Sequence, residues 1–221
     1  MLKQNDKQKG IEIEVGLKFD LGKQFMTQGI ANMLGDWKVC GELLNSLLVG
    51  EPFIYNGVEF ICLDIIDGNY LAMTAKPWAK IPFDTKNHND WRKSSLRRVL
   101  NNDFLKLLDK RHLVMQTSDL IADNGDKAYS TSEDYVTILS CDQYRKYRGI
   151  VPPFEEGMWT LTPWSCNTSY SHLVCNVYTT GYVGSYGANN SLGVAPACLF
   201  SSQNLKLCRQ AHLVGISDEN D

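Results

Sequence analysis

Three side chains in the 221-residue sequence have types that could bind zinc. Cys166, His172 and Cys175 offer two sulfurs and an imidazole in a C-x5-H-x2-C arrangement. Zinc prefers such ligands, but structural zinc sites use four of them in recurrent spacings. This spacing matches no common zinc module, and no fourth ligand is evident. We therefore predict no metal here.

Two groups of polar residues could bind calcium or transfer protons. They are Asp84, His88 and Asp90 in one segment, and Asp119, Asp123, Asn124 and Asp126 in another. The first group lacks the glycine-punctuated spacing of a calcium loop, and the second is a somewhat better set of oxygen ligands. Turns rich in Asp and Asn have the same composition, because these side chains bond to nearby backbone amides. Solvated loops are thus the simpler interpretation, and no metal or cofactor is predicted.

Recognisable catalytic motifs are absent. The sequence contains no nucleophile elbow, phosphate-binding loop, dinucleotide fingerprint or H-E-x-x-H motif. The odd number of cysteines, seven, includes no C-x-x-C pair, so neither a disulfide framework nor a zinc ribbon is indicated. The sequence predicts a protein that is not an enzyme.

Aromatic side chains on a glycine-rich segment are the better functional candidates. Residues 177–191 carry no charge and few aliphatic side chains, and tyrosines recur among glycine, serine and asparagine. Rigid aromatics on such loops are typical of binding surfaces. The predicted ligand-binding residues are Trp164, Tyr170, Tyr178, Tyr182, Tyr186, Asn189 and Asn190. The alternative is a β-hairpin whose tyrosines cover the edge of the domain's own sheet.

The surrounding pattern predicts an α+β domain. We expect strands at 53–55, 58–66, 70–74, 113–116, 135–139, 158–163, 193–200 and 205–216. Helices are expected from about Ile30 to Gly50, from Asp90 to Asp109 with Leu100 and Phe104 on its apolar side, and over 142–148 after a Ser140–Gln143 capping box. The pattern predicts loops at residues 76–90 and 117–133.

The N-terminal region looks like an arm. Residues 11–19 alternate perfectly between apolar and polar side chains, as in a half-buried strand. No neighbouring strand is evident, so we predict a partner that is distant or on another chain. The expected organisation is an arm strand and helix over 1–50, a domain over 51–216 and an acidic tail over 217–221.

Four motifs, in order, resemble an uncharacterised domain family of Gram-positive bacteria and their phages. A W-x-x-S-x-L-R-x-x-L-N-x-x-F helix motif is complete from Trp91 to Phe104. Residues 134–143 resemble its D-x-V-F-L-L-S-x-x-E motif, with Gln143 in place of Glu. Residues 158–163 and 193–197 resemble W-W-L-R-S-P and G-V-R-P-A, but Leu161 and Ala195 replace the family's arginines.

This resemblance implies a C-type-lectin-like or formylglycine-generating-enzyme-like fold, in which a small twisted antiparallel sheet displays variable loops. It also implies a non-catalytic binding or assembly role, as a phage or prophage virion protein of the tail or capsid. A metal- or thiol-dependent enzyme of the formylglycine-generating type, using Cys198 or Cys208, is one alternative. A cytosolic protein-interaction domain is another.

Composition restricts the partners. With a net charge of −3, the composition does not indicate a basic surface for nucleic acid. No apolar run reaches the roughly 20 residues of a membrane span, and the first residues lack the apolar region of a secretory signal. We expect synthesis in the bacterial cytoplasm, a virion location if phage-encoded, and homo-oligomers or larger assemblies. Expected partners are virion or scaffold subunits through the arm, and a host-surface glycan or protein.

Overall fold

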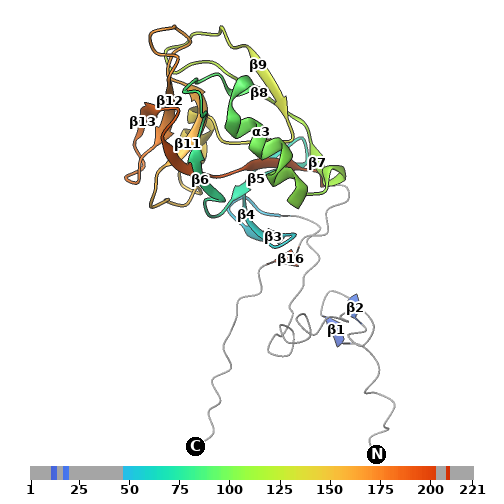
Figure 1. Ribbon diagram of the computed structural model, residues 1–221. Coiled ribbons are helices and arrows are strands. Elements are labelled where there is room, and N and C mark those ends of the chain that lie inside the picture. Colours follow the sequence, from blue (N-terminus) through green and yellow to red (C-terminus); the bar gives the residue numbers. More distant parts are fainter. Residues whose placement is uncertain (1–10, 14–16, 20–46, 203–207, 210–221) are drawn as a thin grey trace, which may run out of the picture. The chain divides into compact units, whose positions relative to one another are not determined.

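The computed structural model describes residues 11–13, 17–19, 47–202 and 208–209 (Figure 1). The chain divides into two compact units, one of residues Asn45–Leu205 and one of residues Met1–Leu44 with Lys206–Asp221. The helix predicted near 30–50 lies almost wholly outside the described residues, as do the 217–221 tail and most of the strand predicted at 205–216, where β16 (Cys208–Arg209) is described.

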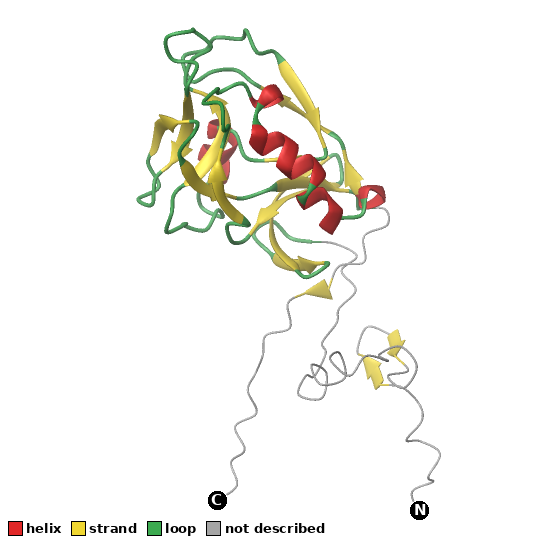
Figure 2. Cartoon of the chain, viewed as in Figure 1, coloured by secondary structure: helices red, strands yellow, loops and turns green. Residues whose placement is uncertain are grey.

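The larger unit is an α+β fold of mostly antiparallel sheets, as the sequence predicts (Figure 2). One sheet has the strand order β10-β15-β5-β4-β3, with β7 also paired to β15. Its strands are β3 (Pro52–Tyr55), β4 (Val58–Ile66), β5 (Asn69–Thr74), β7 (Leu113–Val114), β10 (Val136–Thr137) and β15 (Ala197–Phe200). Asn56-Gly57 and Asp67-Gly68 form the expected tight turns, each with two positive φ angles.

A second sheet carries the segments of functional interest. Its order is β13-β12-β11-β14-β6, and only the β11–β14 pair is parallel. The strands are β6 (Ala79–Pro82), β11 (Met158–Pro163), β12 (Leu173–Val177), β13 (Val183–Gly187) and β14 (Ser191–Val194). The loop predicted over 76–90 is wrong in this part, because residues 79–82 pair with 191–194 at the edge of the sheet.

The single helix predicted from Asp90 to Asp109 is also wrong. The chain forms η2 (Trp91–Lys93), α3 (Ser95–Asn102), η3 (Phe104–Leu107) and, beyond them, η4 (Lys110–His112). Ser94 is extended and accepts a bond from the Arg97 amide, so it caps a new helix within the predicted one. The apolar side is nevertheless as predicted, since Leu100 and Phe104 are fully buried.

The second helix, α4 (Cys141–Tyr147), begins as the sequence predicts. The Ser140 hydroxyl accepts from the Gln143 amide, and the Gln143 side chain accepts from the Ser140 amide. Both halves of the capping box are therefore present. The strand before it is shorter than expected, since β10 covers only Val136–Thr137.

The predicted 117–133 loop contains a hairpin. β8 (Gln116–Asp119) pairs with β9 (Thr131–Asp134), and residues 120–130 connect them. Both strands are polar, and buried Ser132 and Asp134 bond to each other rather than to water. Hydrophobic alternation therefore could not reveal this pair. In Figure 1 the hairpin lies at the top of the larger unit, and β12 and β13 lie at its left edge.

The N-terminal strand predicted over residues 11–19 is two strands. β1 (Ile11–Ile13) and β2 (Leu17–Phe19) pair antiparallel, with Ile11 opposite Phe19. The pairing is local, so the observation that motivated an intermolecular partner no longer holds. Within the described part of the chain, no helix is long and apolar enough to cross a membrane.

Candidate functional site

Two hollows open at opposite ends of strand β12. The first, here called the acceptor hollow, has a volume of about 330 Å³. It is lined by Asp123, Asn124, Asp126, Trp164, Ser165, Asn167 and Tyr170. Two of the predicted ligand-binding aromatics, Trp164 and Tyr170, thus lie beside three residues considered above as metal ligands.

The aromatics of the acceptor hollow are open to solvent. Trp164 is 37% exposed and Tyr170 is 51% exposed. Trp164 directly follows β11, and its amide donates to the Leu173 carbonyl, while Tyr170 closes a turn on Asn167. Exposed rings on a braced backbone lose little conformational entropy when a ligand stacks on them.

Buried Asn89 holds the 164–173 segment in place. Its Nδ2 donates to the carbonyl oxygens of Ser165 at 2.9 Å and Leu173 at 2.8 Å, with a longer bond to Tyr170. Its backbone amide donates to the Ser171 carbonyl. The loop therefore depends on one fully buried amide for backbone bonds that a sheet would otherwise supply.

Tyr129 and Arg92 complete this frame. The Tyr129 hydroxyl donates to Asn89 Oδ1 at 2.8 Å, and the Arg92 guanidinium lies 5.5 Å from the centre of the Tyr129 ring. Arg92 also forms two bonds of 2.9 Å with Asp90. Burial alone would raise the pKa of Asp90, but the bonds from Arg92 outweigh it and lower that pKa. Asp90 is therefore a structural anion.

The other wall of the hollow comes from the 120–126 segment. The Asp123 amide donates to the Pro163 carbonyl, and Asn124 Nδ2 donates to the Ser165 hydroxyl at 3.2 Å. Asn124 Oδ1 and Asp126 Oδ1 accept from backbone amides of their own turn. One oxygen of each carboxylate, Asp123 Oδ2 and Asp126 Oδ2, has no partner among the described residues, so the hollow presents free acceptors.

No cationic side chain lines the acceptor hollow. The nearby cation Arg145 is already bonded, to Asp123 Oδ1 at 3.3 Å and to Asp142 at 2.8 Å. An anionic ligand would therefore meet two carboxylates without a free countercharge. The chemistry favours a neutral ligand that has hydroxyl donors and an apolar face.

Tyr178, Tyr182 and Tyr186 lie outside both hollows. Tyr178 and Tyr182 are in the β12–β13 turn, and Tyr186 is in β13 opposite Val174. The Tyr178 ring covers Gly184 so closely that a Cβ there would lie 2.4 Å from the ring. Tyr178 and Tyr186 therefore share one face of β13, since Gly184 and Tyr186 are two residues apart. Tyr182, 70% exposed, is the least buried of the three.

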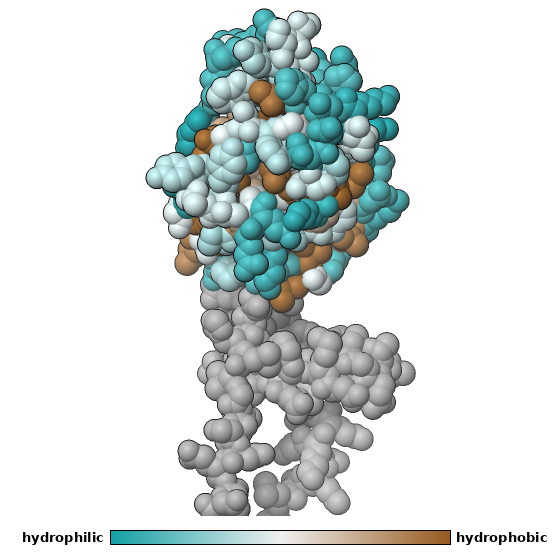
Figure 3. Space-filling view, turned by 60° about the vertical axis from the view of Figure 1, so that its left-hand side comes forward, coloured by the Kyte–Doolittle hydropathy of each residue, from teal (hydrophilic) through white to brown (hydrophobic). Residues whose placement is uncertain are grey.

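Asn189 and Asn190 belong to the turn between β13 and β14. Asn190 Nδ2 donates to the Gly187 carbonyl at 3.1 Å, and the Asn189 amide donates to Asn87 Oδ1. Asn190 thus closes the turn, whereas the Asn189 side chain is exposed. Of the seven predicted residues, Trp164 and Tyr170 line the acceptor hollow, and the other five line neither hollow. On the face shown in Figure 3, hydrophobic residues are scattered among hydrophilic ones.

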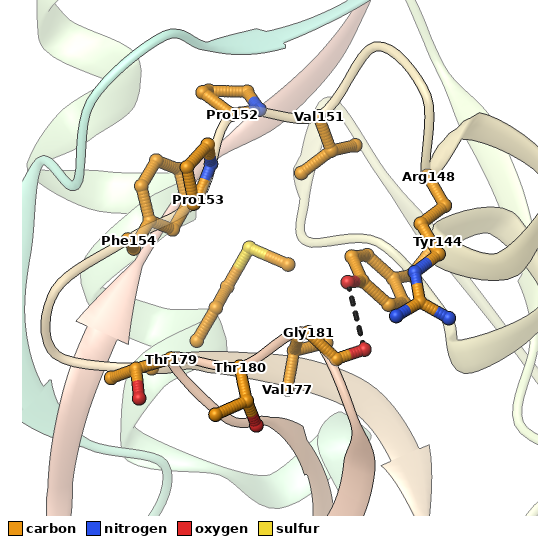
Figure 4. A pocket seen from close by; sticks show the side chains of 12 residues that line it. Tyr144, Arg148, Val151, Pro152, Pro153, Phe154, Val177, Thr179, Thr180 and Gly181 are labelled. Atoms are coloured by element: carbon orange, nitrogen blue, oxygen red, sulfur yellow. Dashed lines mark hydrogen bonds between the residues drawn. The ribbon is translucent and has the colours of Figure 1, made fainter.

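The second hollow, here called the proline hollow, has a volume of about 230 Å³. Its walls are Tyr144, Arg148, Val151, Pro152, Pro153, Phe154, Gly157, Met158, Val177, Thr179, Thr180 and Gly181 (Figure 4). The Tyr144 hydroxyl is occupied by a bond to the Gly181 carbonyl. Arg148 has no acidic partner among the described residues. Apolar walls and a cation at the rim distinguish this hollow from the first.

The first acidic group considered from the sequence has structural roles. Asp84 accepts bonds from the amides of Lys86, His88 and Ser95. His88 Nδ1 lies 3.4 Å from Asp84, and Asp90 caps η2. Asp119, from the second group, is in β8 rather than with Asp123. These carboxylates are committed to turns and helix ends.

The predicted zinc candidates do not gather. Among the described residues, Cys175 clusters with Cys141 and Asp123, not with Cys166 and His172. Cys198, considered above as a catalytic thiol, is fully buried in β15, and burial raises its pKa. A protonated core thiol is no nucleophile. Cys208, the other candidate, lies in β16.

The motif residues of the helix region form one buried bonding network. Trp91 Nε1 and the Arg97 guanidinium donate to the two oxygens of Asp134, at 3.0 and 2.7 Å. Asn101 bonds to both the amide and the carbonyl of Val136. The residues of the first two motifs therefore hold α3 against β9 and β10, and they do not form a ligand site.

Leu161 and Ala195, which replace two arginines of the resembled family, are each 1% exposed. Family models, curated proteins and solved structures give no match to this chain.

Proposed function

We propose that this protein is a non-catalytic binding module whose acceptor hollow takes a neutral saccharide. The observation that carries the proposal is the pairing of two exposed aromatic rings, Trp164 and Tyr170, with the carboxylate of Asp126, which has no ion-pair partner among the described residues. Sugar rings present C–H groups that stack on aromatic faces, and hydroxyls that donate to carboxylate and amide oxygens.

The proline hollow is a weaker site for the same ligand. Its lining includes the exposed cation Arg148, which would favour an anion instead. The tyrosines of the β12–β13 turn offer aromatic surface, but they line neither hollow, although Thr179, Thr180 and Gly181 of the same turn line the proline hollow. Of the two hollows, the acceptor hollow is the one that combines exposed aromatic rings with acceptor groups.

The wider assignment rests on the resemblance stated above. We propose a C-type-lectin-like domain of a phage or prophage virion that displays this hollow toward a host-surface glycan. The arrangement that supports it is a sheet whose strands β11 to β14 follow both helices in the chain, with one wall of the hollow on its β11–β12 loop. Flanking capsid or tail genes would support the virion assignment, and a neighbourhood of metabolic genes would contradict it.

An array of bacterial surface and cell-wall glycans tests the binding function. The full chain should bind a subset of uncharged glycans, and the Trp164→Ala/Tyr170→Ala variant should lose at least 10-fold in affinity. The matched control is Tyr182→Ser, which removes a more exposed aromatic at the other end of β12 and should bind normally. Absence of any glycan binding by the wild-type chain, or release of reducing ends from a bound glycan, would contradict the proposal.

A further inference from the structure

Two buried thiols and one carboxylate converge beside the acceptor hollow. Cys141 is the first residue of α4, Cys175 is in β12, and Asp123 is in the connection between β8 and β9. The two sulfurs and a carboxylate oxygen lie within 4.8 Å of one another. Cys141 and Cys175 are 1% and 0% exposed, whereas the Asp123 side chain reaches solvent.

Polar groups surround the thiols inside the sheet. The Cys141 amide donates to Thr162 Oγ1 at 2.9 Å, and Cys141 Sγ lies 3.4 Å from Thr160 Oγ1. The Thr160 hydroxyl also donates to the Cys175 carbonyl at 2.7 Å. Such a polar environment is unlike that of Cys198, whose pKa is raised by burial alone.

Each thiol alters the ionisation of the other. A hydrogen bond from Cys175 lowers the pKa of Cys141 to about 7, and the same contact raises the pKa of Cys175. A cation that binds both sulfurs as thiolates must displace their protons, so its affinity depends on pH.

We propose that Asp123, Cys141 and Cys175 form a binding site for a zinc ion. Thiolate and carboxylate are zinc ligands, and hard cations such as calcium and magnesium disfavour sulfur. With bonds of about 2.3 Å to sulfur and about 2.1 Å to oxygen, tetrahedral ligands lie roughly 3.6 Å apart. Atoms within 4.8 Å of one another need move little more than 1 Å to reach that arrangement.

Zinc would offset most of the negative charge of the site. Two thiolates and a carboxylate carry three negative charges, and zinc supplies two positive ones. Arg145, which bonds to Asp123 Oδ1 at 3.3 Å and to Asp142 at 2.8 Å, lies beside the remaining charge. Three protein ligands leave a fourth position for water. Asp123 lines the acceptor hollow, so the ion has a path from solvent.

The ligands come from three elements that are distant in sequence. Zinc would fix the hollow's 120–126 wall to the start of α4 and to β12. This inference does not depend on saccharide binding, because the metal alone is the probe. Sequence spacing does not connect the three ligands, since Cys141 and Cys175 are 34 residues apart and Asp123 is a further 18 residues upstream of Cys141.

Cobalt titration of the full chain tests the site. The chain is purified under reducing conditions, treated with a chelator and titrated with Co²⁺. We expect one equivalent to produce a thiolate-to-cobalt charge-transfer band that zinc abolishes. Cys141→Ser and Cys175→Ser should each weaken cobalt binding at least about 100-fold, which is more than second-shell changes cost at metal sites. Cys166→Ser, a nearby thiol outside the cluster, is the matched control and should bind normally.

A second measurement on the wild-type chain keeps the test decisive if a variant does not fold. The ¹¹³Cd chemical shift of the cadmium-substituted chain should report two sulfur ligands. A shift typical of oxygen and nitrogen ligands only, no charge-transfer band in the wild-type chain, or full retention of the band in both serine variants would each overturn the proposal.

Discussion

The acceptor hollow and the proline hollow lie at the two ends of one strand, yet their walls are held by different forces. Hydrogen bonds from Asn89, Tyr129 and Asn124 brace the first. The second is formed by packing of a proline-containing loop against Met158 and Val177. Polar bracing can fix acceptor groups at set positions, whereas apolar packing provides shape and little direction. The difference explains why we assign polar ligand recognition to the first.

Truncation in the shared core should affect both hollows equally. Phe104 is fully buried and contacts Phe60 and Trp78. Phe104→Ala should lower the free energy of unfolding by about 3–5 kcal/mol, as for other buried aromatics. Urea denaturation measures this loss. A loss below about 1 kcal/mol would mean that Phe104 does not belong to the core.

Removing the Asn89 side chain should disturb the acceptor hollow and leave the proline hollow unchanged. Asn89→Ala leaves the Ser165 carbonyl and the Tyr129 hydroxyl without their partner, and it removes one of the two bonds to the Leu173 carbonyl. We expect a loss of about 2–3 kcal/mol, because buried polar groups without partners cost about 1–3 kcal/mol each and water can reach some of them. Hydrogen exchange should rise at residues 164–173 but not at 151–157.

The turn residue Asn190 provides the control for that experiment. Its side chain makes one bond, to the Gly187 carbonyl in a surface turn. Asn190→Ala should therefore cost no more than about 1 kcal/mol and leave exchange at 164–173 unchanged. Equal losses in the two variants would show that Asn89 is no more than an ordinary turn residue.

The sequence predicted the turns, helix starts and buried residues better than it predicted the candidate site. The turns at Asn56-Gly57 and Asp67-Gly68, the capping box and burial of Leu100 and Phe104 all follow from local chemistry, which one segment determines. The β8–β9 pair was missed because both strands are polar and show no hydrophobic alternation, and the edge strand β6 was missed because its partner β14 is more than 100 residues away.

The same limit applies to the candidate site. Trp164 and Tyr170 stood out as aromatics near glycine-rich chain, but nothing local connected them with Asp123 or Asn124. The local sequence did not indicate the role of Asn89, because the carbonyl groups to which its side chain donates lie 76 to 84 residues away. A buried asparagine is recognised only once the fold shows which carbonyl groups it serves.

As the pH falls, the residues that hold the acceptor hollow should lose stability at a higher pH than those that form the proline hollow. The pKa of Asp90 is lowered in the folded protein, so its ionised form contributes stability above the unfolded value near 3.8. That contribution is lost as the pH falls through the folded-state pKa. Stability measured from pH 6 to pH 2 should decline less steeply in Asp90→Asn than in the wild-type chain. Identical slopes would show that the Asp90–Arg92 pair contributes nothing.

Removing the two exposed rings of the acceptor hollow should change the stability of the protein least and its glycan binding most. Trp164→Ala and Tyr170→Ala alter exposed rings, so each should shift the free energy of unfolding by about 1 kcal/mol or less. Thermal unfolding measures this shift. A loss of several kcal/mol would place these rings in the core, and a fall in glycan binding would then reflect unfolding.

Chemical-shift mapping locates the ligand most directly. The ¹⁵N-labelled chain is titrated with the strongest uncharged glycan from the array, and backbone amide shifts are followed. We expect the largest changes at residues 123–126 and 164–170, with residues 148–157 and 179–181 unchanged. Shifts concentrated around Arg148 and the proline loop, or around Tyr178 and Tyr182 alone, would contradict the assignment of the acceptor hollow as the binding site.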